Sequence, residues 1–172
     1  QRVWRRPLSS SGTITPLMVA CRCKQTAAVN VLLESSNLNA QSRSGCTALY
    51  LASEEGDEGA VRGLLERNAD VDARSARGVT PLHCAAFNGR LAASQLLVAR
   101  GADVHAEDVD GHTALADAAY SLQRARTAFK CACVRATDAA SERRQSLEVV
   151  AALLEKAAAL PPSERRTYAA RA

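Results

Sequence analysis

Aromatic residues are scarce in this sequence, and their scarcity limits the core it can build. Two Phe, three Tyr and one Trp occur among 172 residues. Leu, Val and Ala must therefore fill the interior, which suits thin, closely stacked helices. No apolar run approaches the roughly 20 residues of a membrane helix, and no charged-then-apolar signal segment follows Gln1. We expect one domain, in a chain that is either a fragment or trimmed.

Residues that carry catalytic chemistry are also few. The three histidines are His83, His105 and His112, and they are scattered. There is no Gly-rich phosphate loop, no recognisable nucleophile–base motif and no paired set of metal ligands. Because catalysis needs such groups to converge, the sequence predicts no enzyme, no cofactor and no bound metal.

The cysteines do not form a convincing disulfide or metal framework. They are Cys21, Cys23, Cys46, Cys84, Cys131 and Cys133. Members of the two closely spaced pairs are two residues apart, so on a helix they point to opposite sides. We favour buried small hydrophobic residues over disulfides or metal ligands. Reduced thiols then indicate an intracellular protein, cytoplasmic or nuclear.

Charge of one sign is not concentrated on the repeats themselves. The net charge is +4. Residues 1–11 carry +3 from Arg2, Arg5 and Arg6, residues 12–120 carry −4, and residues 121–146 carry +4. This is not the concentrated basic face of a dedicated nucleic-acid binder.

A repeat with a period of 33 residues organises the chain. A Thr-(Ala/Pro)-Leu triplet recurs at that interval, with a Gly two positions before it. The triplets open at Thr47, Thr80 and Thr113, and the glycines are Gly45, Gly78 and Gly111. A looser copy opens at Thr15. A unit of this length buries its apolar face only by stacking on its neighbours.

The third repeat shows why each unit predicts two helices. Thr80 is a good N-cap, and Pro81 suits the first helical position. Gly89 supplies a left-handed stop. A second helix is expected from Leu91 to Gly101, followed by an extended loop into the next unit.

In these motifs the chain resembles the ankyrin-repeat family. Residues 80–86 read Thr-Pro-Leu-His-x-Ala-Ala, and residues 101–103 read Gly-Ala-Asp. The resemblance covers about residues 13–120 and 146–158. It implies an all-α solenoid of about four helix-turn-helix units with β-turn connections, in which His83 hydrogen-bonds within and between repeats. The expected segments are a leader over 1–12, repeats over about 13–44, 45–77, 78–110 and 111–160, and a tail over 161–172.

The fourth repeat departs from the pattern. Leu122 stands where the terminating Gly belongs, and the second-helix sequence resumes at Leu147, after a basic insertion over about residues 121–145. We expect a first helix lengthened by several turns and a new helix start at Thr137 or Asp138. Leu122, Ala125 and Phe129 would share a face covered by Leu147 and Val150.

The resemblance also implies a binding surface. Members of the family bind protein partners with the β-turn tips and the exposed face of each first helix. The matching tip residues here are Ser44, Cys46, Arg74, Arg77, Val79, Asp108, Asp110 and His112, and the matching helix-end residues are Arg22, Glu54, Glu55, Phe87, Asn88 and Tyr120. Phe87 and Tyr120 are candidate aromatic anchors. We expect a scaffold or adaptor, either monomeric or part of a larger chain.

Two alternative functions stay open. The repeats could space or cap a longer array, or the leader and the insertion could bind nucleic acid or anionic lipid, which the composition does not favour. A salt-sensitive affinity would indicate the second. The acidic cluster of Glu54, Glu55, Asp57 and Glu58 is either a solvated turn or, in part, a contact for a basic partner.

Overall fold

The computed structural model describes residues 14–130, 138–161 and 164. Within them the chain forms eight helices and no β-sheet, apart from one isolated bridge between Glu107 and Thr113. The helices are α1 (Pro16–Arg22), α2 (Thr26–Leu32), α3 (Ala48–Glu55), α4 (Glu58–Glu66), α5 (Pro81–Phe87), α6 (Leu91–Ala99), α7 (Ala114–Lys130) and α8 (Asp138–Ala159). None of these helices is long and apolar enough to cross a bilayer.

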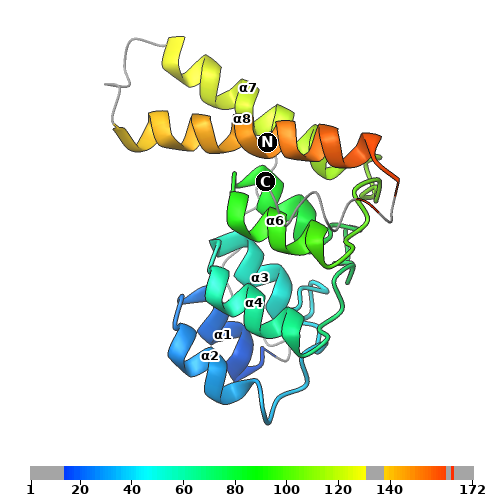
Figure 1. Cartoon of the computed structure of the whole chain (residues 1–172). Coiled ribbons are helices and arrows are strands. Elements are labelled where there is room, and N and C mark those ends of the chain that lie inside the picture. Colours follow the sequence, from blue (N-terminus) through cyan, green and yellow to red (C-terminus); the bar gives the residue numbers. More distant parts are fainter. Residues whose placement is uncertain (1–13, 131–137, 162–163, 165–172) are drawn as a thin grey trace.

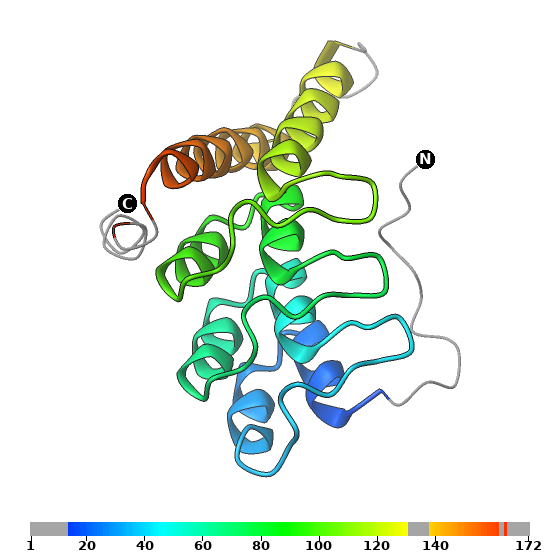
Figure 2. The ribbon, with the colours of Figure 1, turned by 90° about the vertical axis from the view of Figure 1, so that its right-hand side faces the viewer.

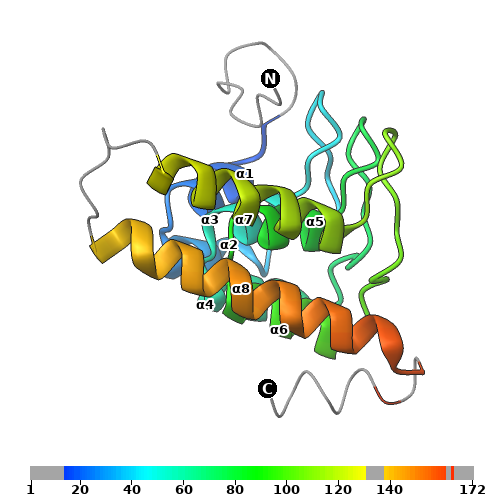
Figure 3. The same cartoon turned by 90° about the horizontal axis from the view of Figure 1, so that it is seen from above.

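The helices pair in sequence order, and the four pairs stack in two rows (Figure 1). The first helix of each pair packs on the first helix of the next, so that α1, α3, α5 and α7 form an inner row. The second helices, α2, α4, α6 and α8, form an outer row in the same way. Figure 3 shows the two rows side by side, with the connecting loops projecting beside the inner row. The expected all-α solenoid of four helix pairs is confirmed.

The capping residues begin the inner helices where the repeat predicts. The Thr47 hydroxyl accepts a hydrogen bond from the Tyr50 amide at 3.2 Å, and Thr15 and Thr113 do the same for the amides three residues later. Gly56 and Gly89 have φ values of +73° and +66° at the helix ends. Asn68 has φ of +59° after α4, a left-handed conformation that Asn tolerates better than most other non-Gly residues.

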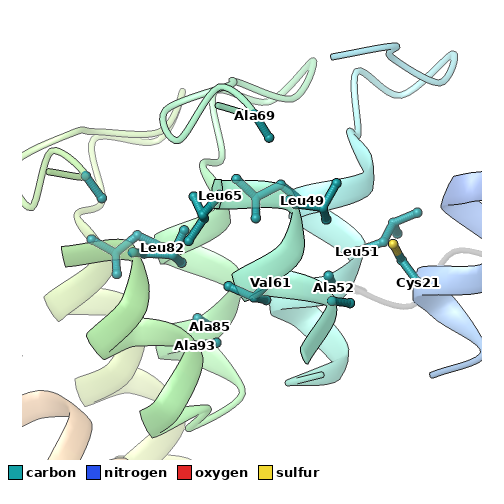
Figure 4. Packing of buried hydrophobic residues seen from close by; sticks show 14 of the residues in the cluster. Cys21, Leu49, Leu51, Ala52, Val61, Leu65, Ala69, Leu82, Ala85 and Ala93 are labelled. Carbon is teal, nitrogen blue, oxygen red and sulfur yellow. The ribbon is translucent and has the colours of Figure 1, made fainter. Parts of the chain in front are cut away.

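Leu, Val and Ala fill the core between the two rows (Figure 4). Leu82, Ala85 and Ala86 are fully buried along one side of α5, as their spacing predicts. Small residues such as Ala52 and Ala85 let neighbouring helices approach closely, and Leu49 and Leu82 fill the space beside them. The scarcity of aromatic residues is therefore compatible with a continuous core.

The insertion makes a helical hairpin. α7 has 17 residues where α5 has 7, so the predicted lengthening is confirmed, and α8 begins at Asp138. In Figure 3 the hairpin projects from the side of the molecule opposite the loops. Leu122 and Ala125 are half-buried, but the side chain of Phe129 lies outside the described residues.

Leu147 has a role that the sequence did not predict. Its fully buried side chain lies against Gly89 of the preceding repeat, where a Cβ atom on that glycine would come within 3.0 Å of the Leu147 Cγ atom. Leu147 thus anchors the returning helix on the third repeat, so the hairpin is attached to the stack at its base.

We expect the projecting part of the hairpin to be dispensable for folding. Replacing residues 124–143 by a short Gly-containing turn keeps Leu122, Leu147 and every contact of the first three repeats. The melting temperature should therefore stay within a few degrees of that of the intact chain, and capture of a partner should be unchanged. Unfolding of the shortened chain would show that the hairpin is part of the core. Loss of partner affinity in a folded variant would make the insertion the recognition element.

Candidate functional site

Three β-turn tips lie one above another along one edge of the stack (Figure 2). Each tip closes with the same pair of backbone bonds, for example Ser75 N–H to Val79 O at 3.0 Å and Gly78 N–H to Ser75 O at 2.9 Å. The Ala76 amide also donates to the Ser44 carbonyl, and the Val109 amide to the Arg77 carbonyl. Successive tips are therefore joined through their backbones into one rigid edge.

In each tip a side-chain oxygen accepts hydrogen bonds from backbone amides of the same turn. The Ser42 hydroxyl accepts the Cys46 amide, and the Ser75 hydroxyl accepts the amides of Arg77 and Val79. In the last tip Asp108 takes this role, because its Oδ1 atom accepts the amides of Asp110 and His112, both at 2.9 Å. These are the local turn bonds that Ser and Asp favour.

This arrangement corrects two of the predicted contact residues. Asp108 is 7% exposed and is engaged inside its own turn, and Val79 is 1% exposed. Cys46 and His112 occupy the same repeat position as Val79 but are half-buried. A repeat position identifies a tip residue, but the packing of each tip decides whether its side chain reaches the surface. Val79 and Asp108 therefore present almost no surface to a partner.

Charged groups of neighbouring tips contact each other. The Arg77 guanidinium pairs with the Asp110 carboxylate at 3.0 Å, and Arg74 donates to the Glu107 carbonyl at 3.0 Å. Both members of the Arg77–Asp110 pair are about half exposed, so the pair adds little to stability. It places a positive and a negative group side by side on the open surface.

Asp72 connects the loop backbones of the second and third repeats. Its Oδ1 atom accepts the Asp103 amide at 3.0 Å, and Asn39 accepts the Asp70 amide in the same way one repeat earlier. Burial raises the pKa of Asp72, while the hydrogen bond from Asp103 acts against that rise. The loops are therefore linked by side chains as well as through their tips.

His83 links the third and fourth repeats. Its Nε2 atom lies 3.0 Å from the His112 carbonyl oxygen, and because that oxygen can only accept, the proton is on Nε2. Nδ1 is then the acceptor for the Thr80 amide at 3.3 Å and for the Thr80 hydroxyl at 2.8 Å. The expected structural role, within and between repeats, is confirmed.

The ends of the inner helices form the second part of the predicted surface. Glu54, Phe87 and Tyr120 occupy equivalent positions on α3, α5 and α7, each seven residues after the capping Thr. Tyr120 is 42% exposed, and Glu54 and Phe87 are half-buried. Arg22, Glu55 and Asn88 beside them are also half-buried. The structure therefore brings the predicted helix-end residues together on the inner row.

The acidic cluster separates into structural and surface members. Asp57 caps α4 through the Ala60 amide at 3.1 Å and also accepts the Thr26 hydroxyl of the first repeat. Glu58 pairs with Arg62 one turn later on the outer row. Only Glu54 and Glu55 therefore belong to the inner-row surface.

Buried thiols on the inner row behave as small hydrophobic residues. Burial raises the pKa of Cys21 to about 12, and burial raises that of Cys84 well above its ordinary value. Burial also raises the pKa of Tyr50, whose hydroxyl hydrogen-bonds to Cys84. The described cysteines Cys21, Cys23, Cys46 and Cys84 form no disulfide, while Cys131 and Cys133 lie outside the described residues.

Two arginines that sequence reasoning missed reach back to the preceding repeat. Arg90 donates from Nε to the Glu54 carbonyl at 3.2 Å, and Arg100 donates to the Leu65 carbonyl. They satisfy carbonyl groups at the ends of α3 and α4, where a helix has no partners of its own. The sequence gives little indication of this role, because only one other repeat has an Arg at the position of Arg100, namely Arg67.

One group of residues has the composition of a cation site. Ligand atoms of Asp108, Asp110 and His112 lie within 4.8 Å of one another. Asp108 holds the turn and Asp110 pairs with Arg77, so the fold itself accounts for this cluster.

The comparison with protein families agrees with the stack. The family described as "Ankyrin repeats (3 copies)" matches residues 7–75 and again residues 70–164. The chain belongs to the ankyrin-repeat family. A comparison with curated proteins found no match. Ankyrin repeats are in general protein-interaction modules, and the family membership accounts for both the helix pairs and the tips.

The glycines of the ankyrin tips provide a test of how rigid this edge is. Gly45 has φ of +74°, and a Cβ atom there would lie 2.5 Å from the Ala76 nitrogen. Gly111 has the same φ but no atom within 4 Å of such a Cβ. Gly111→Ala should cost only the left-handed conformation, about 1–2 kcal/mol, whereas Gly45→Ala should cost more and expose the Ala76 amide. Urea melts of the two variants and hydrogen exchange at the Ala76 amide compare these effects. Equal losses in the free energy of unfolding would show that the tip backbones shift to accommodate a Cβ atom at Gly45.

Proposed function

We propose that this ankyrin-repeat chain is a scaffold or adaptor that binds a protein partner, and that it has no catalytic role. The observation that carries the proposal is the alignment of the tips and the inner-helix ends along the same row (Figure 3). The proposed contact residues are Arg22, Glu54, Glu55, Arg74, Arg77, Phe87, Asn88, Asp110, His112 and Tyr120. An intracellular location, cytoplasmic or nuclear, is proposed with it and is supported by the four described cysteines, which are free thiols.

The chemistry of the surface favours a partner that offers both charged groups and apolar pockets for aromatic rings. Phe87 and Tyr120 would supply most of the binding free energy as anchors. The paired charges of Arg77 and Asp110 would align the partner and speed its encounter more than they would increase affinity.

A pull-down with three alanine substitutions tests the proposal. The chain with Arg77, Phe87 and Tyr120 changed to Ala should lose the protein that the intact chain captures. A matched control changes three exposed outer-row residues, Val31, Arg62 and Glu66, to Ala and should still capture it. Capture that is equal for both triple variants would contradict the proposed surface.

A second candidate function is to end or extend a larger helical assembly. Ala86 of the third repeat is fully buried, but Ala119, its equivalent in the fourth repeat, is exposed, as is Val149 on α8. This outward face of the last pair is the one that a further helix pair would cover. A chain with Ala119→Glu and Val149→Glu would lose its partner under this reading, but would keep it if the inner row is the binding surface.

A further inference from the structure

The first helix pair leaves apolar side chains exposed at the N-terminal end of the stack. Val31 on α2 is 74% exposed and Val19 on α1 is 43% exposed. Ala27 on α2 is exposed as well. Single exposed apolar residues are ordinary, but the terminal repeat of a stack usually presents a polar outer face. We call Val19, Ala27 and Val31 the N-terminal end face.

The second repeat shows which way the two α2 residues of this face point. Gly63 of α4 holds the repeat position of Val31, and a Cβ atom on Gly63 would lie 2.9 Å from the Leu33 Cδ1 atom of the preceding repeat. Gly59 holds the repeat position of Ala27, and a Cβ atom there would also meet a side chain of α2. Val31 and Ala27 therefore point to where a preceding outer helix would pack.

The α1 residue of the face points the same way. Leu51 of α3 holds the repeat position of Val19. Leu51 is buried and points toward Cys21 of α1 (Figure 4), the inner helix of the preceding repeat. All three residues of the N-terminal end face thus occupy positions that, in the second repeat, contact the repeat before it.

The leader, residues 1–12, carries apolar residues in register with the loops that precede the later repeats. Trp4 and Leu8 stand eleven and seven residues before the capping Thr15. In the loops of the third and fourth repeats, the residues at these two distances from the capping Thr are buried alanines. They are Ala69 and Ala73 before Thr80, and Ala102 and Ala106 before Thr113. The leader therefore has the apolar pattern of a repeat loop, with larger side chains at its two buried positions.

We propose that the leader docks on the N-terminal end face and covers it in place of a further helix pair. One repeat later, the side chain that meets the Val31 position is Leu33, at the end of α2. Leu33 stands three residues before Ser36, and Ser36 holds the repeat position of Trp4. The repeat geometry therefore brings Trp4 close to Val31, where an indole ring can bury about 150–250 Å² of surface.

The tether favours this docking. Only residues 13–15 separate the leader from α1, and a segment linked so closely is held at an effective concentration of about millimolar. The extended chain from Trp4 to Ile14 spans up to about 33–36 Å, well beyond the 8–10 Å or so between packed helices. The docked leader closes this end of the stack to a preceding helix pair or a second copy. The inference goes beyond the proposed function, because it leaves the inner row unused.

Trp4 is the one tryptophan of the sequence, so its fluorescence reports on the leader alone. In the full chain its emission should lie at shorter wavelength than that of a solvent-exposed indole, with slower acrylamide quenching. Both effects should persist in about 1 M NaCl, where the Debye length is about 3 Å, because the contact is apolar. The full-chain variant Val31→Glu should lose both effects. The control Val149→Glu, which changes an exposed Val at the opposite end of the stack, should keep them.

A leader-side variant keeps the test decisive if Val31→Glu unfolds the stack. Leu8→Gln in the full chain changes no residue of the described helices. It should shift the Trp4 emission to that of an exposed indole and speed hydrogen exchange in α2, while exchange in α6 stays the same.

Three results would overturn the inference. They are an exposed Trp4 in the intact chain, a Leu8→Gln variant that changes neither the emission nor the exchange, and a buried Trp4 that becomes exposed on dilution. The last result would place a second copy, and not the chain's own leader, on the N-terminal end face. None of these measurements involves a captured partner, so such a failure would leave the pull-down result for the proposed function standing.

Discussion

Leu82→Ala is expected to lower the free energy of unfolding by about 2–4 kcal/mol, the usual cost of a large-to-small change in a packed core. Leu82 is fully buried in α5, which packs against α3 on one side and α7 on the other. The cavity would thus weaken two repeat interfaces at once. In a linear stack, stability is close to a sum of repeats and nearest-neighbour interfaces.

Leu17→Ala is the matched comparison for this prediction. Leu17 holds the equivalent position in α1 and is as fully buried as Leu82, so the two substitutions remove the same atoms from the same degree of burial. α1 packs on one inner helix, α3, and its loss leaves the remaining repeats stacked. We expect a smaller loss for Leu17→Ala in urea melts. Equal losses would contradict a stack whose ends are weaker than its middle.

His83→Ala is expected to have an effect of similar size, about 2–4 kcal/mol, but for a different reason. The substitution deletes the acceptor for the Thr80 amide and hydroxyl and the donor to the His112 carbonyl. Buried polar groups that lose their partners cost about 1–3 kcal/mol, and a cavity adds to this cost.

The effect of His83→Ala on hydrogen exchange should be confined to particular segments. Because His112 belongs to the last tip, His83→Ala should increase hydrogen exchange in residues 107–112 as well as at the start of α5. His105→Ala removes an exposed loop histidine and should change stability by less than about 0.5 kcal/mol. If His83→Ala leaves hydrogen exchange in the last tip unchanged, the hydrogen bond from His83 to the His112 carbonyl does not contribute to the stability of that tip.

The repeat pattern predicted the elements of this fold because each depends on local chemistry. A Thr N-cap, a first-turn Pro and a left-handed Gly act within a few residues, so their 33-residue spacing determines the helix pairs. The missing Gly at Leu122 predicted the long α7 for the same reason. His83 was assigned correctly through its position in the repeat motif.

The surface was less predictable, because exposure depends on contacts between repeats. Val79 and Cys46 share a repeat position, yet Val79 is buried and Cys46 is half-buried. The repeat position predicts Asp108 as a contact residue, but its carboxylate takes the place of the Ser hydroxyl inside the turn. The 33-residue register could have indicated the Arg77–Asp110 pair, since it places these side chains beside each other. The reach of Arg90 and Arg100 depends on side-chain rotamers that the sequence does not specify.

Hydrogen exchange of the chain with and without its captured partner tests the proposed binding surface most directly. We expect partner-induced protection in the tips, residues 74–78 and 109–112, and at the inner-helix ends, residues 54–55, 87–88 and 120. The outer helices α4, α6 and α8 should exchange at the same rate in both states. Protection confined to the outer row, or to the outward face of α7 and α8, would contradict recognition through the tips and the inner helices.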